Sequence, residues 1–471
     1  MSAGTFRDPS GSLFDVEGRI LRLVPASTAG RFEALLALPV VASLVERRAI
    51  VATARLTADS VPAPLCSLDG VWFEHERVGF VAHPGEWPAE MLMAAALHTL
   101  DITDELLRHG LILKDATPSN VLFRDTRPVL VDVPSIEPLI AGSSIWTARH
   151  QFETTFLLPL MANVELGLPI AWSLSEPATG LSHERIAQML GARRWLGLEH
   201  IRNVALPAAL SGAQVSAPTA AAAVEPNSGN TRLMAKSQFV LGRSMAGLRR
   251  SILRLGRGLE RRQSHWSGYT ATRSHYNEQD LADKRSFVRE ALARCEPRWV
   301  IDIGANTGEF SEIAAERAST ISIDLDEASV GAIYARAVGG KRSIQPLVVD
   351  ISQPTPGTGW KNGERKSFLQ RAEGRFDLAM MLAVVHHLRV AAGVPLAEII
   401  DLGVRLGAGN LVFEFVPKDD PMFRAIARGR EALYTDYSEL DCERLLLERL
   451  HIEDSRRLSN GRTLFWGRRK G

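Results

Sequence analysis

The sequence predicts at least two folded domains, the second of which has an α/β fold built on a largely parallel sheet. Short apolar runs alternate with helical stretches from Trp299 onward, which is typical of βαβ units. Near the end of the chain, Asn460-Gly461 separates two further apolar runs and predicts an antiparallel hairpin. The length of 471 residues, at roughly 100–200 residues per domain, leaves ample chain for a separate first domain.

Composition narrows the class of protein. Hydrophobic residues make up 45% and charged residues 23%, which argues against disorder and a collagen-like rod. The three cysteines, Cys66, Cys295 and Cys442, form no C-x-x-C pair, so we predict no metal site and no disulfide framework. The polar start of the chain and the prolines within the apolar stretch 156–174 predict neither a signal peptide nor a transmembrane segment. We therefore expect a soluble, cytoplasmic protein.

A linker and a basic helix separate the two domains. Residues 203–232 are rich in Ala, Pro and Ser, and residues 233–264 have an apolar stripe opposite several arginines. That stripe comprises Phe239, Leu241, Met245, Leu248, Ile252, Leu255 and Leu259. Residues 1–200 hold 16 basic and 23 acidic side chains, whereas residues 201–270 hold 10 and 2. We expect the helix to dock on the acidic domain 1–202 or elsewhere on its own chain; a membrane or RNA surface is the alternative.

The second domain, which we place at 265–471, contains a strand, a glycine-rich turn and a helix in direct succession. The strand begins at Trp299 and leads through Asp302, Gly304, Asn306 and Gly308 into a helix predicted over 309–318. Glycines at 304 and 308 allow a ligand to approach the backbone closely. A dinucleotide fingerprint would require glycine where Asn306 and Glu309 stand, so a pyrophosphate cradle is disfavoured.

The following strands end in polar residues. The strand 321–324 ends in Asp324, 20 positions after Gly304, the spacing at which a carboxylate accepts hydrogen bonds from a ribose. The strand 345–350 ends in Asp350, placed to receive an adenine amino group. The strand 376–387 brings His386 and His387 to the same edge. The strand 411–416 carries Glu414, and the runs 452–459 and 462–466 form the hairpin.

These motifs resemble the class I S-adenosylmethionine-dependent methyltransferases, and most closely a bacterial nodulation-type methyltransferase family with a kinase-like segment in front. The supporting stretches are 266–284, 302–310, 354–360 with 364–365, 386–388 and 414–422. The resemblance implies a seven-stranded Rossmann-like sheet and the cofactor S-adenosyl-L-methionine. It assigns Asp302 and the turn with Gly304, Asn306 and Gly308 to the methionine end, Asp324 to the ribose and Asp350 to the adenine.

Candidate residues for the transfer step follow from its chemistry. Methyl transfer is an in-line displacement, so the protein aligns the reactants and, where required, removes a proton. His386 or His387 is the candidate base and Glu414 a second candidate, with a structural histidine as the alternative. Trp360, Glu364 and Arg365 could line an acceptor pocket or form a surface loop. Lys284 and Tyr276 could cover the cofactor.

The first domain carries a second resemblance. Asp115, Asn120 and Asp132 are spaced like the base and magnesium-binding residues of protein-kinase-like and aminoglycoside-phosphotransferase-like folds. No glycine-rich loop precedes them, Lys114 stands directly before Asp115, and Arg22 occupies the place where a lysine is expected. We therefore expect a degenerate kinase-like α+β domain that presents substrate or binds a partner; an active phosphotransferase and an unrelated α+β domain are the alternatives.

The acceptor is the least determined feature. The family resemblance implies a small molecule or a glycan, whereas the basic segment leaves RNA or protein open. The sequence gives no indication of oligomeric state. The rival functions are a phosphotransferase fused to a methyltransferase and a non-catalytic scaffold that binds S-adenosyl-L-methionine.

Overall fold

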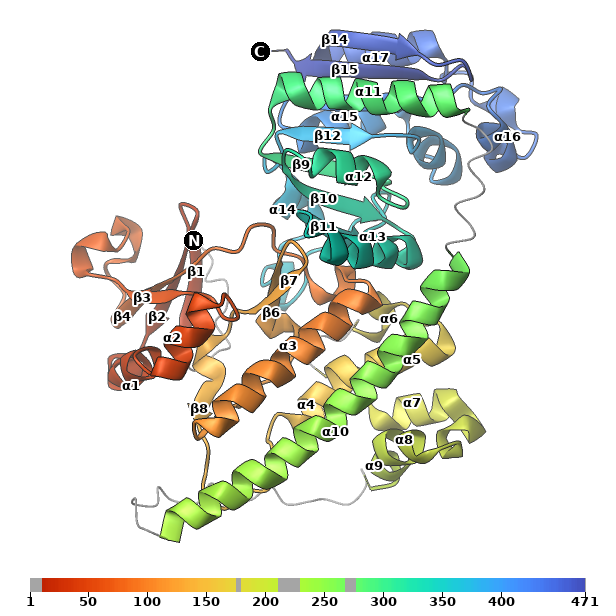
Figure 1. The fold of residues 1–471 in the computed structure, drawn as a ribbon. Coiled ribbons are helices and arrows are strands. Elements are labelled where there is room, and N and C mark those ends of the chain that lie inside the picture. The colour runs from red at the N-terminus through yellow and green to blue at the C-terminus, as the bar shows by residue number, and fades with distance from the viewer. Residues whose placement is uncertain (1–10, 175–178, 211–228, 267–276, 471) are drawn as a thin grey trace. The chain divides into compact units, whose positions relative to one another are not determined.

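A computed structural model describes residues 11–174, 179–210, 229–266 and 277–470 (Figure 1). The chain divides into two compact units, Met1–Glu260 and Arg261–Gly471. The division falls within the last turns of a long helix, close to the start of the second domain expected at residue 265.

The first unit begins with a small antiparallel sheet of strand order β1-β2-β4-β3. Glu17 and Gly18 join β1 to β2, and both have positive φ, as tight hairpin turns require. Two short antiparallel pairs follow, β5 with β8 and β6 with β7. The strands are β1 (Ser12–Val16), β2 (Arg19–Val24), β3 (Thr53–Arg55), β4 (Val71–His75), β5 (Leu111–Leu113), β6 (Val121–Arg124), β7 (Arg127–Leu130) and β8 (Ile136–Pro138).

Helices form the rest of the first unit. They are α1 (Ala26–Leu36), α2 (Pro39–Glu46), α3 (Ala89–Arg108), α4 (Arg149–Phe152), the π-helix η6 (Glu153–Leu157), α5 (Leu158–Leu166), α6 (Ile170–Ser173), α7 (His183–Leu190), the 3₁₀ turn η7 (Gly191–Trp195), α8 (Leu198–His200), the π-helix η8 (Ile201–Ala205), α9 (Leu206–Leu210) and α10 (Gly229–Trp266). The apolar stretch 156–174 contributes buried helix to this core, as expected. Among the described residues, no single helix is long and apolar enough to cross a membrane, and only the bent pair α1 and α2 meets that test jointly.

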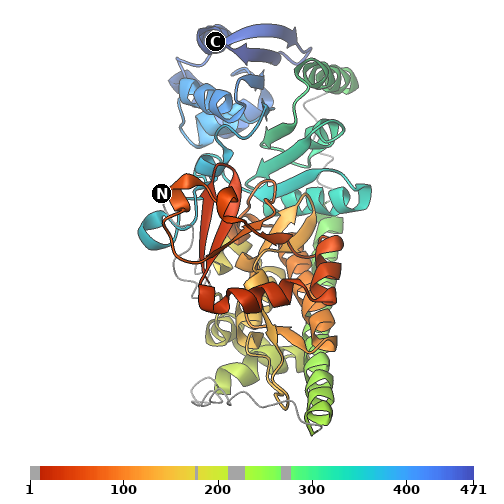
Figure 2. The same cartoon turned by 90° about the vertical axis from the view of Figure 1, so that its left-hand side faces the viewer.

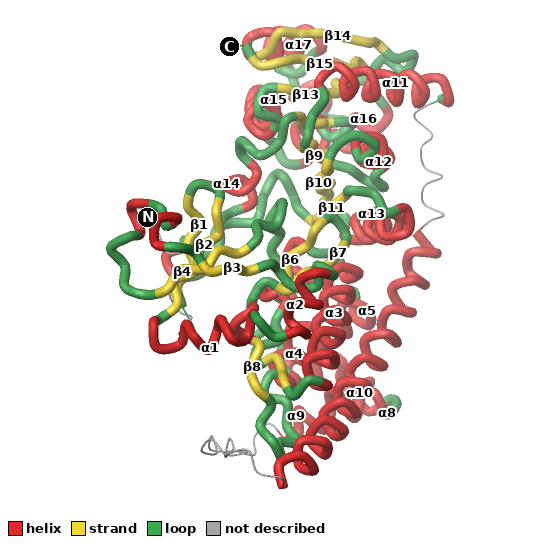
Figure 3. Tube along the Cα trace, turned by 60° about the vertical axis from the view of Figure 1, so that its left-hand side comes forward, coloured by secondary structure: helices red, strands yellow, loops and turns green. Residues whose placement is uncertain are grey.

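The basic helix docks on the first unit, which confirms the favoured prediction. Helix α10 lies alongside α3 (Figure 3). The two helices are antiparallel, since Gln238 donates to the carbonyl of Leu107 and Arg249 forms an ion pair with Asp101. The predicted apolar stripe is buried from Leu241 to Leu259, but Phe239 is 71% exposed. The inclusion of Phe239 was wrong because two residues turn a helix by about 200°, so the buried positions run through Ser237 and Leu241 instead.

The second unit is built on one seven-stranded sheet of order β11-β10-β9-β12-β13-β15-β14. The first five strands in that order are parallel, and β15 runs antiparallel to both of its neighbours, β13 and β14 (Figure 2). The strands are β9 (Trp299–Ile303), β10 (Ser319–Asp324), β11 (Ile344–Val348), β12 (Leu378–Met381), β13 (Asn410–Phe415), β14 (Leu450–Arg457) and β15 (Thr463–Arg469).

Helices cover both faces of this sheet, with α11, α12 and α13 on one face and α15 and α17 on the other (Figure 3). The alternation of strand residues explains the two layers: Met380 and Val412 pack against α11 and α12, whereas Met381 and Leu411 lie against Gly403 of α15. The helices are α11 (Glu278–Cys295), α12 (Glu309–Ala314), α13 (Glu327–Gly340), α14 (Phe368–Ala372), the π-helix η11 (His387–Ala391), α15 (Leu396–Leu406), α16 (Pro421–Ala427) and α17 (Glu439–Arg449).

Several element boundaries differ from the sequence expectations. Helices η8 and α9 extend to Leu210 within the segment expected to be linker, and α12 ends at Ala314. Strand β12 ends at Met381 instead of continuing to His387, because Ala383 adopts a positive φ of 55° and the chain then enters a helical turn. The hairpin connection is five residues long, 458–462, instead of a two-residue turn at Asn460-Gly461.

Candidate active site

The turn between β9 and α12 forms the centre of the candidate site. Gly304, Asn306 and Gly308 all have positive φ, of 74°, 48° and 79°. A Cβ on Gly304 would lie 2.8 Å from the Val384 side chain, and one on Gly308 would lie 2.7 Å from Ile333. Glycine is therefore required at both positions for backbone and packing reasons.

Asp302 is buried directly beneath this turn. Its Oδ2 accepts a 2.6 Å hydrogen bond from the Ser311 hydroxyl of α12. Burial raises the pKa of Asp302 to about 6, although the Ser311 hydrogen bond and the charge of Lys284 act in the opposite direction. A buried carboxyl with a pKa this high is frequently part of a functional site.

Asp324 lies at the tip of β10, beside the same turn. Its two oxygens accept backbone hydrogen bonds from Asn306, at 2.7 Å, and from Asp326, at 3.0 Å. Burial raises its pKa, and these backbone hydrogen bonds limit the rise. The carboxylate of Asp324 therefore links β10 to the turn between β9 and α12 through hydrogen bonds.

Asp350 follows β11 on the same edge of the sheet, because β9, β10 and β11 are parallel and end together. One of its oxygens accepts from the backbone NH and the hydroxyl of Ser352, at 2.9 and 2.6 Å. Asp302, Asp324 and Asp350 therefore stand at or just beyond the carboxyl ends of three adjacent strands.

The two histidines stand just beyond β12 and differ in environment. His387 is exposed, whereas His386 is 2% exposed and neither of its ring nitrogens has a hydrogen-bond partner. The rings lie 4.3 Å apart, centroid to centroid. Burial, assisted by the nearby charges of His387 and Arg462, lowers the pKa of His386 to about 3. The buried imidazole is therefore neutral near pH 7.

A buried network of charged side chains lies behind the site. Lys284 Nζ donates to Glu414 Oε2 at 2.6 Å, and the guanidinium of Arg462 lies 3.6 Å from Glu414 Oε1. Arg462 Nε also donates to Asp420 Oδ2 at 2.8 Å. Burial would raise the pKa of Asp420, but its contacts with Arg462 outweigh burial and lower it. Two cations and two carboxylates thus compensate one another.

Sequence reasoning missed Arg462 and Asp420. Asp420 caps α16 by accepting from the Met422 NH, and Asp-Pro before an apolar run was the available signal for that cap. Arg462 was taken as the first residue of a strand. It lies in the hairpin connection instead, and its side chain points into the network.

The remaining candidates occupy separate places. An antiparallel bridge joins Thr358 to Arg365 in the loop after β11, and Trp360 within that loop is exposed. Lys284, a candidate to cover the cofactor, is buried in its pair with Glu414. Tyr276 lies outside the described residues.

Two of the three kinase-type residues of the first unit lie near one another: Asn120 Nδ2 is 3.5 Å from Asp132 Oδ2. Asp115 lies in the connection between β5 and β6 that ends at Asn120, whereas Asp132 follows β7. The buried Arg22 of β2 lies 3.5 Å from Asp132 Oδ1 and donates through Nε to His75 at 3.1 Å. Asp132 therefore already has a cation beside it. The described residues contain no cluster of three or more His, Cys, Asp or Glu side chains arranged to hold a metal ion.

The structure is similar to several solved proteins. The N-methyltransferase NodS from Bradyrhizobium japonicum WM9, in complex with S-adenosyl-L-homocysteine, is 20% identical; the match covers 46% of this chain and 98% of NodS with a TM-score of 0.32. Magnesium protoporphyrin IX methyltransferase (ChlM) from Synechocystis PCC 6803, with bound S-adenosylmethionine, is 16% identical over 45% of this chain and 97% of ChlM, with a TM-score of 0.31. The bifunctional kinase-methyltransferase WbdD is 19% identical over 44% of this chain and 41% of WbdD, with a TM-score of 0.30.

The sequence matches no protein-family model. It is, however, 32% identical over 444 residues to nodulation protein NoeA of Rhizobium meliloti (strain 1021), a match that covers 93% of this chain and 89% of NoeA. Because the identity extends over nearly the whole length of both chains, this protein belongs to the family of nodulation protein NoeA.

Proposed function

We propose that the second unit is an S-adenosyl-L-methionine-dependent methyltransferase whose cofactor lies along the carboxyl edge of the sheet. The observation that carries this proposal is the left-handed turn at Gly304, Asn306 and Gly308, fastened to Asp324 and flanked by Asp302 and Asp350. In this reading Asp302 and the turn contact the methionine end, Asp324 the ribose and Asp350 the adenine.

The donors and acceptors present suit such a ligand. A carboxylate has about four lone-pair sites, and the two backbone hydrogen bonds to Asp324 leave acceptor capacity for two ribose hydroxyls. The turn 302–308 contains no Lys or Arg, which suits a nucleoside without phosphates. Asp350, half-buried at the next strand, still has one oxygen to accept from an adenine amino group.

His386 is the base that we propose for acceptors that lose a proton. When bound, the cofactor supplies an electrophilic methyl group on a sulfonium sulfur. The unpaired nitrogens of the neutral His386 can accept a hydrogen bond from the attacking hydroxyl. Because the pKa of His386 is about 3, it takes the proton only as methyl transfer makes that hydroxyl strongly acidic. Glu414 holds Lys284 and Arg462 in place instead of acting as a base, since both of its oxygens face cations.

The acceptor class that we propose is a small molecule or a glycan, in a process related to nodulation. Its support is the family resemblance and the name of the relative, nodulation protein NoeA. Tritiated cofactor incubated with the full chain and a fractionated lysate identifies the class, and label found only in RNA or protein would contradict it.

For the first unit we propose a degenerate kinase-like domain without phosphotransfer. The support is the Asp115, Asn120 and Asp132 spacing together with Arg22, whose guanidinium stands beside Asp132, where a metal would be held. Magnesium-dependent ATP turnover that is lost in Asp132→Ala would contradict the proposal and favour a phosphotransferase.

Calorimetric titration of the full chain with S-adenosyl-L-homocysteine tests the cofactor site. Asp324→Ala removes two charged hydrogen bonds to the ribose, each worth about 1.5–3 kcal/mol, so affinity should fall at least about a hundredfold. Asp419→Ala, which removes an exposed carboxylate, is the matched control and should leave affinity unchanged. Equal affinity in wild type and Asp324→Ala, with both proteins folded by circular dichroism, would refute the ribose assignment.

A further inference from the structure

Three apolar side chains are exposed to solvent where η7 ends and α8 begins. Trp195, Leu196 and Leu198 are 55%, 67% and 84% exposed. Eighteen large hydrophobic side chains are exposed among the described residues, and five of these lie between 195 and 210. Isolated exposed leucines need no explanation, but a Trp and two leucines within four consecutive residues do. We call residues 193–198 the apolar tip.

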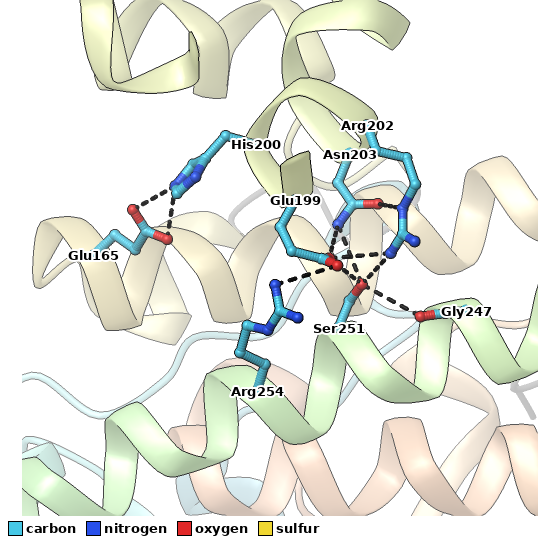
Figure 4. A network of polar contacts seen from close by, with 8 residues as sticks. All are labelled: Glu165, Glu199, His200, Arg202, Asn203, Gly247, Ser251 and Arg254. Atoms are coloured by element: carbon cyan, nitrogen blue, oxygen red, sulfur yellow. Dashed lines mark hydrogen bonds and ion pairs between the residues drawn. The ribbon is translucent and has the colours of Figure 1, made fainter. Parts of the chain in front are cut away.

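The apolar tip is held in place by ordered polar contacts. Glu199, the residue after Leu198, accepts hydrogen bonds from Ser251, Arg202 and Asn203 at 2.7 to 3.0 Å (Figure 4). Its other oxygen lies 3.3 Å from Arg254 of α10.

A second contact fixes the same short helix on its other side. His200 pairs with Glu165 of α5 at 2.8 Å (Figure 4). The helix that follows the apolar tip is therefore fastened to both α10 and α5. The three apolar side chains are therefore exposed on a segment that is held in place by its contacts with α5 and α10.

The charge of this region is strongly one-sided. Residues 185–198 contain Arg185, Arg193 and Arg194 and no Asp or Glu, in a domain whose first 200 residues carry more acidic than basic side chains. Arg185 and Arg193 are exposed. The nearest following carboxylate, Glu199, faces Arg202 and Arg254 and is compensated by them. The apolar tip therefore presents positive charge beside its apolar side chains.

We propose that the apolar tip binds the surface of an anionic lipid membrane. Trp is enriched at membrane interfaces, and arginines beside it gain from the negative surface potential of anionic lipids. Leu196 and Leu198 would enter the boundary between headgroups and acyl chains. Three side chains provide far less than the roughly 800 Å² per partner of a standard protein interface, which favours a lipid surface over a protein partner.

Vesicle cosedimentation of the full chain tests this proposal. The vesicles are phosphatidylcholine alone, and phosphatidylcholine mixed with phosphatidylglycerol. We expect binding to the mixed vesicles, and a loss of at least about tenfold in the double variant Leu196→Ser/Leu198→Ser, since each leucine buried contributes roughly a factor of ten. Leu440→Ser/Leu447→Ser, which changes two exposed leucines of α17, is the matched control and should bind like wild type.

Two further measurements locate the contact. Arg193→Gln should weaken binding to the mixed vesicles only. Brominated acyl chains should quench part of the tryptophan fluorescence of wild type, and that part should be absent in Trp195→Phe. The proposal is overturned if wild type does not bind mixed vesicles, or if the apolar-tip variant binds as tightly as wild type. A self-association in sedimentation velocity that the apolar-tip variant abolishes, without vesicle binding, would also overturn it and assign the surface to a second copy.

Discussion

Substitution of Asp302 by Asn should stabilise the protein while it abolishes cofactor binding. Burial raises the pKa of Asp302 from an ordinary value of 3.8 to about 6. At about 1.36 kcal/mol per pH unit, this rise corresponds to a destabilisation of about 3 kcal/mol when the carboxylate is charged. Asparagine keeps an acceptor for the Ser311 hydroxyl and carries no charge. We therefore expect a gain of about 2–3 kcal/mol at pH 7.5.

The gain should depend on pH in a defined window. The folded state holds the Asp302 proton up to about pH 6, whereas the unfolded state releases it near pH 4. Wild type therefore loses stability relative to Asp302→Asn as pH rises from about 4 through 6, and the difference becomes constant above about pH 7. Other titrating groups are common to both proteins and cancel in the difference.

Differential scanning calorimetry of both proteins from pH 5 to pH 8 provides the measurement. For a unit of 150–250 residues, 1 kcal/mol shifts Tm by about 2–4 °C, so a rise of roughly 5–10 °C is expected at pH 7.5 in the transition of the second unit. Titration with S-adenosyl-L-homocysteine should show binding to wild type only. A lower Tm in Asp302→Asn than in wild type at pH 7.5, or a Tm difference that does not change with pH, would refute the claim that the buried Asp302 carboxylate destabilises the fold.

Three further outcomes follow from the described contacts. Lys284→Met leaves Glu414 buried without its closest cation, so we expect calorimetry to show a loss of about 3–5 kcal/mol in the free energy of unfolding. An unchanged Tm would contradict a stabilising role for the Lys284–Glu414 ion pair. In α10, Leu248→Ala should cost about 2–5 kcal/mol and Arg249→Gln less than about 1 kcal/mol, since the arginine pair is solvent-exposed; equal losses would contradict hydrophobic docking. His386→Asn should lower the methyl-transfer rate but keep cofactor affinity, and the wild-type rate should show no ionisation of His386 between pH 5 and 8 because its pKa is about 3. A step in that profile that His386→Asn removes would contradict the neutral-base assignment.

The sequence could predict the edge of the sheet where the acidic residues lie. Apolar runs of strand length alternate with helical stretches, and parallel strands place their carboxyl ends together. Asp324 and Asp350 follow such runs, so their common edge was predictable. The glycines at 304 and 308 were predictable for the same reason: a strand that leads directly into a helix requires residues that tolerate positive φ.

Other features depended on contacts that a linear pattern does not contain. The apolar run through Val384 and Val385 continued the strand pattern up to His387, but the positive φ of Ala383 ends the extended backbone and turns the chain into a helix. Buried strand and buried helix have the same composition over such a short run. Phe239 was misplaced because it lies only two residues before Leu241 in a sequence that is apolar at many positions. Only contact with α3 determines which side of α10 is buried.

Burial is the main reason that His386 stays neutral, and the neighbouring buried cations add to it. Lys284 and Arg462 come from α11 and from the hairpin connection, about 180 residues apart, and both raise the electrostatic cost of an imidazolium near them. Glu414 and Asp420 offset part of the cost of burying these cations through direct contacts, although burial still lowers the pKa of Lys284. The same environment leaves the ring nitrogens of His386 unprotonated at pH 6 to 7, but it also makes the imidazole a weak base, because it opposes the charge gained with a proton. Glu414 therefore adds to the effect of burial on His386 by holding Lys284 and Arg462 beside it, a role that no local sequence motif specifies.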